Sequence, residues 1–357
     1  MARLLIEALG VAGHEVRLGA RLRTRDGSGN IKRQERLKSL SEKLVERYLR
    51  RVSSGQEPRP DLWFTYHLYY KAPDWIGPLV ADALSIPYVV AEASVAHKRA
   101  GGPWDLGHQG TLEALQRADL VIGFTELDAK KVRPELNVPD RYRTLPPFLE
   151  SDRIVASPGE HENRNEIDMK AVSLLAVGMM RSGDKFRSYQ ALAQAMSMLA
   201  SQEWHLTLVG DGPKRAEVEE LFAPFEGKVT FTGQLDEAAL STLYQHADLM
   251  VWPAVNEAYG MALLEAQAAG LPVVAGRYLG VPDVVSEGET GLLSEPEDLA
   301  GFSADIDRLI EDERLRNLMS AAAISKVRAH HSLPAAAGKL GTWIDAVHTR
   351  YRADGPL

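Results

Sequence analysis

The chain has 357 residues, more than one hydrophobic core usually holds, so its length predicts two domains. It is 45% hydrophobic and 25% charged, as in ordinary soluble proteins, and no apolar run approaches the ~20 residues that span a bilayer. The net charge is −8, and the acidic excess lies in residues 166–357, which hold 16 Lys and Arg against 27 Asp and Glu. This balance argues against nucleic-acid binding, and the lack of cysteine excludes disulfides, thiolate metal sites and a cysteine nucleophile. Because Glu7 interrupts what would be the apolar part of a signal peptide, we expect a cytoplasmic location.

Short apolar runs alternate with helical patterns in both halves of the chain, which predicts two parallel sheets wrapped by helices. The stretch 151–168 is polar and without periodicity, so we place the linker there. Residues 3–9 and 335–351 read as the first and last helices. The strands are predicted at residues 14–18, 61–65, 87–90, 119–122 and 141–145 in the first half, and 172–177, 205–209, 228–231, 248–252 and 272–275 in the second.

Residues 31–52 form an amphipathic helical pattern with an apolar stripe and many basic residues around it. A basic amphipathic helix can rest on anionic lipid, which makes peripheral membrane contact one interpretation. We favour a surface helix that packs on its own domain, because Glu35, Glu42 and Glu46 dilute the positive charge. The stripe consists of Leu37, Leu40, Leu44, Tyr48 and Val52.

Two glutamates flank the start of a predicted helix that follows the apolar strand 249–252. Glu257 lies in the turn, the helix is predicted to begin near Tyr259, and Glu265 lies about two turns from Glu257. The free amides and the positive dipole end of such a helix suit a diphosphate. The two carboxylates could then take hydroxyl groups at opposite ends of a ligand made of a sugar, a diphosphate and a ribose. The alternative is that both glutamates only favour the dipole and water.

The stretch resembles the retaining glycosyltransferases of family 4, whose hallmark is two glutamates separated by seven residues, with an aromatic-Gly pair after the first. Glu257, Tyr259, Gly260 and Glu265 match it, and residues 269–275 and 290–293 resemble the elements that follow in the family. The resemblance extends over most of the chain. It implies an α/β protein of GT-B fold, with two Rossmann-like doubly wound domains facing a cleft.

The predicted domains are residues 1–165 on the acceptor side and 166–335 on the donor side, with 336–357 as a helix that returns to the first domain. Family members normally begin with a strand and a glycine-rich loop, and no strand precedes the helix at residues 3–9. We therefore expect that about 20–30 residues are absent from the N-terminus, through truncation, a misassigned start or loss of part of the site.

The resemblance implies a hexosyltransferase that is metal-independent and moves a sugar from a nucleotide diphosphate sugar to a hydroxyl acceptor with retention of configuration. The acceptor would be a glycan, a lipid-linked molecule or a small molecule, as in polysaccharide biosynthesis. No cofactor is expected beyond the nucleotide sugar itself. Two alternatives stay open, a GT-B sugar phosphorylase and a non-catalytic protein that binds nucleotide sugars.

On the donor side, Lys185 falls on the family lysine that binds the diphosphate, whereas Met179 replaces the family arginine and Arg181 lies two residues on. The resemblance assigns Glu265 to the ribose, Glu257 to the transferred sugar, and the amides of residues 259–261 to sugar and phosphate. The glycines of 210–212 allow a tight turn near a ligand, although many α/β domains use such a string only to turn. The predicted donor-binding set is Arg181, Lys185, Gly210, Asp211, Gly212, Glu257, Ala258, Tyr259, Gly260, Met261 and Glu265.

On the acceptor side, the family often carries a histidine at the end of a first-domain strand. Glu92 occupies roughly that place here, and His67 and His97 are further candidates. A lone His or Glu beside a strand end is more often a structural hydrogen-bonding group. The candidate catalytic residues are Glu257, Lys185, Glu92 and His67.

Overall fold

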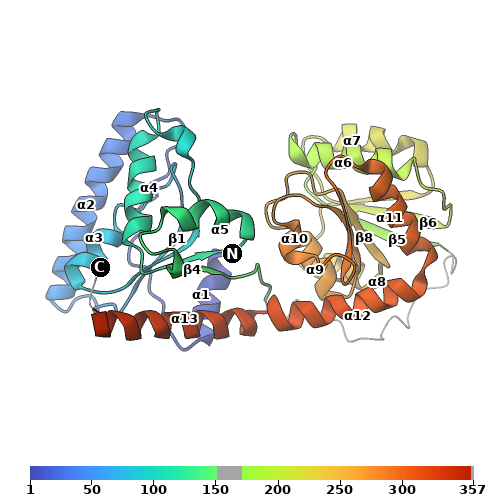
Figure 1. Ribbon diagram of the computed structural model, residues 1–357. Helices are drawn as coiled ribbons and strands as arrows, with labels where there is room; N and C mark the ends of the chain where they lie inside the picture. Colours follow the sequence, from blue (N-terminus) through green and yellow to red (C-terminus); the bar gives the residue numbers. More distant parts are fainter. Residues whose placement is uncertain (151–170, 355–357) are drawn as a thin grey trace. The chain divides into compact units, whose positions relative to one another are not determined.

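The computed structural model describes residues 1–150 and 171–354 (Figure 1). The chain forms two compact units, Met1–Pro146 with Ala336–Leu357 (unit 1) and Pro147–Ala335 (unit 2). The predicted linker at 151–168 and the predicted domain boundary between residues 165 and 166 lie outside the described residues. None of the described helices is both long and apolar enough to cross a membrane.

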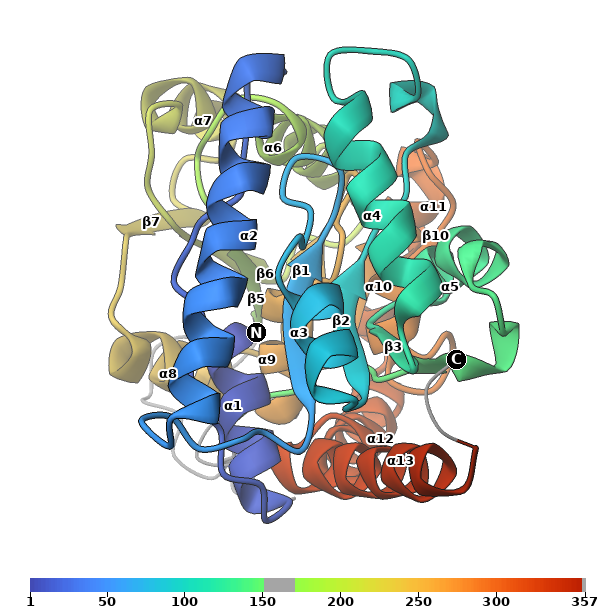
Figure 2. The ribbon, with the colours of Figure 1, turned by 90° about the vertical axis from the view of Figure 1, so that its left-hand side faces the viewer.

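Unit 1 is built on a parallel sheet whose strands follow chain order, β1-β2-β3-β4. Helices α2, α3 and α4 pack together in front of this sheet in Figure 2. The strands are β1 (Trp63–Leu68), β2 (Tyr88–Ala93), β3 (Leu120–Gly123) and β4 (Tyr142–Thr144), at four of the five predicted positions. The helices are α1 (Ala2–Val11), α2 (Ile31–Ser53), α3 (Gly77–Leu84), α4 (Asp105–Arg117), α5 (Glu126–Val132) and α13 (Leu333–Asp354), with short 3-10 turns η1 (His97–Arg99), η2 (Arg133–Glu135) and η3 (Pro139–Arg141).

The strand predicted at residues 14–18 is wrong, since this segment pairs with no strand of the described sheet. Its apolar side chains face water, with Val16 41% and Leu18 71% exposed. Glu15 and Arg17 pair with each other, the Nε–Oε1 distance being 2.7 Å. The alternation of apolar and charged residues therefore marks an extended segment but not a strand, because neither of its faces is buried.

Helix α2 packs on its own unit through part of the predicted apolar stripe. Asn30 caps its start by accepting a hydrogen bond from the Arg33 N–H at 3.0 Å. Leu37 is buried, and Val45 lies in a cluster with residues of α3, whereas Leu40 remains 38% exposed. The apolar face of α2 is thus largely used within unit 1, as expected for a surface helix.

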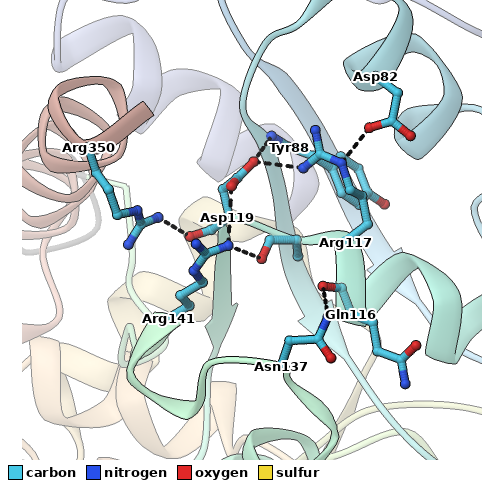
Figure 3. A network of polar contacts seen from close by, with 9 residues as sticks. Asp82, Tyr88, Gln116, Arg117, Asp119, Asn137, Arg141 and Arg350 are labelled. Atoms are coloured by element: carbon cyan, nitrogen blue, oxygen red, sulfur yellow. Dashed lines mark hydrogen bonds and ion pairs between the residues drawn. The ribbon is translucent and has the colours of Figure 1, made fainter. Parts of the chain in front are cut away.

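The last helix, α13, is tied to unit 1 by a network around Asp119 (Figure 3). The Asp119 side chain is 3% exposed and accepts hydrogen bonds from Arg117 at 2.9 Å, Arg141 at 3.3 Å and the Tyr88 N–H at 2.9 Å. Arg350 of α13 donates to the Asp119 carbonyl oxygen at 2.5 Å. One buried carboxylate thus organises the amino ends of β2 and β3, and its backbone holds the terminal helix.

Unit 2 is built on a six-stranded parallel sheet of order β10-β9-β8-β5-β6-β7. The strands other than the edge strand β7 are mainly apolar and contribute to one large hydrophobic core, as expected for a sheet covered on both faces. The strands are β5 (Val172–Val177), β6 (Trp204–Val209), β7 (Val229–Gly233), β8 (Leu249–Trp252), β9 (Val273–Gly276) and β10 (Gly291–Ser294). The helices are α6 (Asp184–Met196), α7 (Arg215–Phe222), α8 (Glu237–His246), α9 (Met261–Ala268), α10 (Val281–Val284), α11 (Leu299–Glu311) and α12 (Glu313–His330), with the 3-10 turn η5 (Ala223–Phe225).

The strand order of unit 2 reverses at β5, which pairs with β6 on one side and with β8 on the other. In open parallel sheets, ligands bind beyond the carboxyl ends of the strands at such a reversal. The loops that follow β5 and β8 are therefore the place where a ligand of unit 2 is expected. These two loops contain Lys185 and Glu257, or adjoin them.

Candidate functional site

The loop after β8 is fastened to the first turns of α6 by three successive residues. Each of them contacts a different side chain of α6. These contacts hold the loop after β8 against the start of α6 at the strand-order reversal. The contacts are Val255 N–H to Ser188 Oγ at 3.0 Å, Asn256 Nδ2 to Asp184 Oδ1 at 3.2 Å, and Lys185 Nζ to Glu257 Oε2.

Lys185 and Glu257 form an ion pair at the edge of unit 2 where the strand order reverses. Both side chains are 21% exposed, so the pair is partly shielded but reachable from solvent. The Lys185 Nζ atom also lies 5.5 Å from the centroid of the Trp252 ring, at the end of β8. A bound anion would meet a fixed cation here, and Glu257 lies beside it.

The backbone of the same loop adopts the left-handed conformation at three places. Ala254 has φ 54°, Asn256 has φ 51° and Gly260 has φ 67°. Only glycine occupies this region without cost, so the first two residues are held there by their surroundings. Such strain is found at functional sites, and here it turns the chain so that Glu257 faces Lys185.

Helix α9 begins at Met261, two residues later than predicted, because Gly260 is left-handed and cannot belong to the helix. Among the residues that the structure describes, no side chain caps this start. The first backbone bond of the helix runs from the Leu264 N–H to the Gly260 carbonyl at 3.0 Å, so the amides before Leu264 point out of the helix end. Of the predicted amide donors only Met261 lies in the helix, while Tyr259 belongs to the preceding turn.

Glu265 lies one turn inside α9 and is half-buried. The Tyr244 hydroxyl, from α8, lies 3.3 Å from Glu265 Oε2 and 3.3 Å from the Ala262 carbonyl oxygen. Tyr244 thus orients the carboxylate from the neighbouring helix. Glu257 and Glu265 lie on either side of the start of α9 in the sequence, as the spacing predicts.

The glycines after β6 are explained by the close packing of two loops. A Cβ atom on Gly210 would overlap the carbonyl of Gly178, and one on Gly212 would overlap the carbonyl of Met180. The Met180 N–H donates to the Asp211 carbonyl at 2.9 Å, which joins the loops after β5 and β6. These glycines therefore allow the loop after β6 to pack closely against the loop after β5, which leads to α6.

Met179, which stands where the resembled family has an arginine, lies on the surface of unit 2. Met179 is 54% exposed and Arg181 is exposed two residues later, in the same loop. Hydrogen bonds from Arg187 and Asn256 lower the pKa of the Asp184 carboxyl, and the charge of Arg181 contributes to this. Arg181 therefore lies close enough to the start of α6 to act on charges there.

On the acceptor side, the structure brings His67 and Glu92 together at the ends of β1 and β2. Their Nδ1 and Oε2 atoms are 3.1 Å apart, and both residues are left-handed, with φ 67° and 58°. The hydrogen bond to Glu92 raises the pKa of His67. Burial, together with a hydrogen bond to Glu92, raises the pKa of Tyr66. His97 is separate from this pair, since its Nε2 atom contacts Glu135 Oε1 at 2.9 Å.

The His67–Glu92 pair makes a pH-dependent prediction. Because Glu92 favours the charged imidazole, the pKa of His67 should lie above its ordinary value of about 6.5 and fall in Glu92→Gln. The pair then stabilises the fold fully below pH ~6.5, and this contribution is lost as the pH rises through the raised pKa. An NMR titration of the His67 ring in both proteins measures the shift. Identical midpoints would contradict the account.

Several site residues could not be found from the sequence. Ser188 lies 67 residues from Val255, and Tyr244 lies 21 residues from Glu265, so no local spacing connects the partners. The sequence shows Ser188 only as a polar residue near the amino end of a helix. It shows Tyr244 only as an aromatic residue near the end of another helix. In residues 1–150 and 171–354, no group of three or more His, Asp or Glu is placed to hold a metal ion.

Comparisons with known proteins support a glycosyltransferase fold. Residues 171–312 match the family model described as Glycosyl transferases group 1. A sulfoquinovosyl transferase of Arabidopsis thaliana is 35% identical over 140 residues, but this match covers 38% of the present chain and only 27% of that protein. A D-inositol 3-phosphate glycosyltransferase of Corynebacterium diphtheriae is 26% identical over 298 residues, which cover 77% of this chain and 68% of the relative.

Among solved structures, that of Anabaena HepE in complex with UDP superposes with a TM-score of 0.66 at 16% identity. The match covers 85% of this chain and 82% of HepE. The two parallel-sheet α/β units thus have the GT-B architecture that the sequence predicts.

Proposed function

We propose that the chain is a GT-B glycosyltransferase of the group 1 family, whose model matches residues 171–312, and that it transfers a sugar from a nucleotide diphosphate sugar to a hydroxyl acceptor with retention of configuration. One observation carries the proposal. The Lys185–Glu257 pair and the uncapped start of α9 meet at the strand-order reversal of unit 2. A cation, backbone amides and a carboxylate at this edge of the sheet support the binding of a sugar diphosphate.

Each donor group has a stated role. Lys185, with Arg181, binds the diphosphate, and the amides at the start of α9 share its charge. Glu257 accepts hydrogen bonds from hydroxyl groups of the transferred sugar, and Glu265, oriented by Tyr244, accepts them from the ribose. Donor binding would therefore move Lys185 from Glu257 to the diphosphate and leave the carboxylate for the sugar.

The proposed reaction breaks the bond between the sugar C1 and the diphosphate oxygen, and the acceptor oxygen forms the new bond at C1. Retention requires the acceptor to approach on the face from which the diphosphate departs. The departing phosphate oxygen can then take the proton of the acceptor hydroxyl. Lys185, Arg181 and the amides stabilise the charge that develops on the diphosphate, so we propose that the transfer is metal-independent.

We expect Glu265→Ala to weaken donor binding by about tenfold or more, because the ribose loses a charged hydrogen-bond acceptor. The measurement is thermal unfolding with UDP-, GDP- and ADP-sugars, in which a ligand at 100 times its dissociation constant adds about 2.7 kcal/mol. Tyr244→Phe should reduce the shift less, since it only releases the carboxylate. Glu217→Ala, an exposed change in α7, is the matched control. Equal shifts in the wild type and Glu265→Ala would contradict the assignment.

Turnover decides between the proposal and its alternatives. With a binding donor and an alcohol acceptor, NMR of the product should show the same anomeric configuration as the donor. Inversion would overturn the retaining mechanism. Sugar phosphate released only with added inorganic phosphate would indicate a phosphorylase, and donor binding without any transfer would indicate a non-catalytic binding protein.

A further inference from the structure

Unit 1 holds two cations against two aromatic rings in the loops that follow β1 and β2. The Lys71 Nζ atom lies 5.7 Å from the Tyr70 ring centroid and 5.5 Å from that of Trp104. The Arg99 guanidinium carbon lies 5.2 Å and 5.0 Å from the same rings. The rings themselves meet edge to face at 5.9 Å. We call these four residues the aromatic–cation cluster.

The cluster is built on a fixed scaffold. A tight turn links Tyr69 and Ala72 through reciprocal backbone bonds, and the Lys71 carbonyl accepts from the Asp26 N–H at 2.7 Å. The Trp104 Nε1–H donates to the Asp26 carbonyl at 3.1 Å. The Asp26 carboxylate is itself occupied by three neighbours, Ser28, Asn30 and Gln34. Its hydrogen bonds are therefore used within its own loop and the first turn of α2.

The positive charges of the cluster are not neutralised by any carboxylate in the described part of the chain. Within residues 1–150 and 171–354, neither the Lys71 ammonium nor the Arg99 guanidinium has an ion-pair partner, and the ring contacts remove no charge. The Arg99 Nε–H is buried and has no acceptor in the described part of the chain. A buried donor without an acceptor is costly, so a bound anion would supply what this site lacks.

The position of the cluster suits a substrate. Tyr70 and Lys71 follow the carboxyl end of β1, and Arg99 and Trp104 follow that of β2, which is the ligand-binding edge of a parallel sheet. Tyr69 connects the cluster to the His67–Glu92 pair, since its ring lies 4.8 Å from that of His67 and 5.8 Å from that of Tyr70.

We infer that the aromatic–cation cluster binds an anionic group, a phosphate or a carboxylate, on the acceptor whose hydroxyl group is presented to His67 and Glu92. The inference rests on the proposed function. Arg99 can form a fork of two hydrogen bonds with such a group, and Lys71 adds a second charge. Because the cations lie over both rings, the rings serve to position charge rather than to stack on a neutral sugar.

The test compares glucose 6-phosphate, inorganic phosphate and neutral glucose as probes, with binding to the intact chain measured by calorimetry. Arg99→Gln and Lys71→Gln should each weaken the binding of glucose 6-phosphate by about tenfold. Added salt should weaken this binding in the wild type. Arg133→Gln is the matched control, because Arg133 lies over the Tyr142 ring at 5.4 Å in the same unit, outside the cluster. Thermal unfolding of each variant shows that it remains folded.

Vesicles of phosphatidylglycerol, against vesicles of phosphatidylcholine, distinguish a lipid headgroup from a soluble acceptor. Binding of glucose 6-phosphate that depends on Arg99 and Lys71 would support a soluble acceptor, and the same dependence seen only with phosphatidylglycerol would support a lipid-linked one. The inference would be overturned if glucose and glucose 6-phosphate bind equally. It would also be overturned if Arg99→Gln and Lys71→Gln leave the affinities for glucose 6-phosphate and for phosphatidylglycerol vesicles unchanged. Donor binding is measured separately, so failure of the nucleotide-sugar panel counts against the proposed function alone.

Discussion

Lys185→Ala is expected to reduce kcat for sugar transfer by about 100- to 1,000-fold, the effect of removing one positioned donor from a developing negative charge. Lys185 is held over the Trp252 ring and beside Glu257, so only a short shift of its side chain would bring its charge from Glu257 to the diphosphate. Glu257→Gln should also reduce kcat, because the transferred sugar loses a charged acceptor. Both are measured as initial rates with saturating donor.

A matched control for Lys185 exists in the same unit. Lys228 lies 4.8 Å from the Trp204 ring, so it has the same lysine-on-tryptophan contact, but it precedes β7 and Trp204 begins β6. Both therefore lie at the amino edge of the sheet, away from the strand-order reversal. Lys228→Ala should keep the wild-type rate, and equal losses in the two lysine variants would contradict the role given to Lys185.

Asp119→Asn is expected to destabilise unit 1 by about 3–5 kcal/mol, as when one partner of a buried ion pair is removed. The asparagine can still accept from the Tyr88 N–H, but Arg117 and Arg141 lose the buried charge that they share (Figure 3). Urea unfolding followed by circular dichroism measures the change.

The neighbouring Asp82 provides the control for this network. It contacts the same Arg117, at 2.5 Å, but its side chain is 58% exposed. An exposed ion pair contributes about 0–1 kcal/mol, so Asp82→Asn should have a small effect. Similar losses in both variants would show that burial of Asp119 is not what makes the network stabilising.

The central strands of unit 2, such as β8 and β9, were predictable from the sequence because they are short apolar runs. A strand covered on both faces carries this signal without help from its neighbours. The segment 14–18 had a strand-like alternation, and the prediction failed because pairing and burial, which are tertiary properties, are missing there. The start of α9 was misplaced by two residues because a left-handed Gly260 is not distinguishable in sequence from a helical one.

The sequence located the donor-side candidates but not their surroundings. The spacing of Glu257 and Glu265 and the position of Lys185 could be read directly, whereas the links to Ser188 and Tyr244 depend on contacts between distant segments. The aromatic–cation cluster was not found for the same reason, since its residues come from two loops that only the parallel pairing of β1 and β2 brings together.

A structure of the chain with a bound nucleoside diphosphate, chosen as the one that gives the largest thermal shift, tests the central claim most directly. The account predicts the diphosphate within about 3 Å of Lys185 Nζ and of the amides at the start of α9, with the ribose at Glu265. A nucleotide bound away from the strand-order reversal of unit 2, with the Lys185–Glu257 pair unchanged, would contradict it.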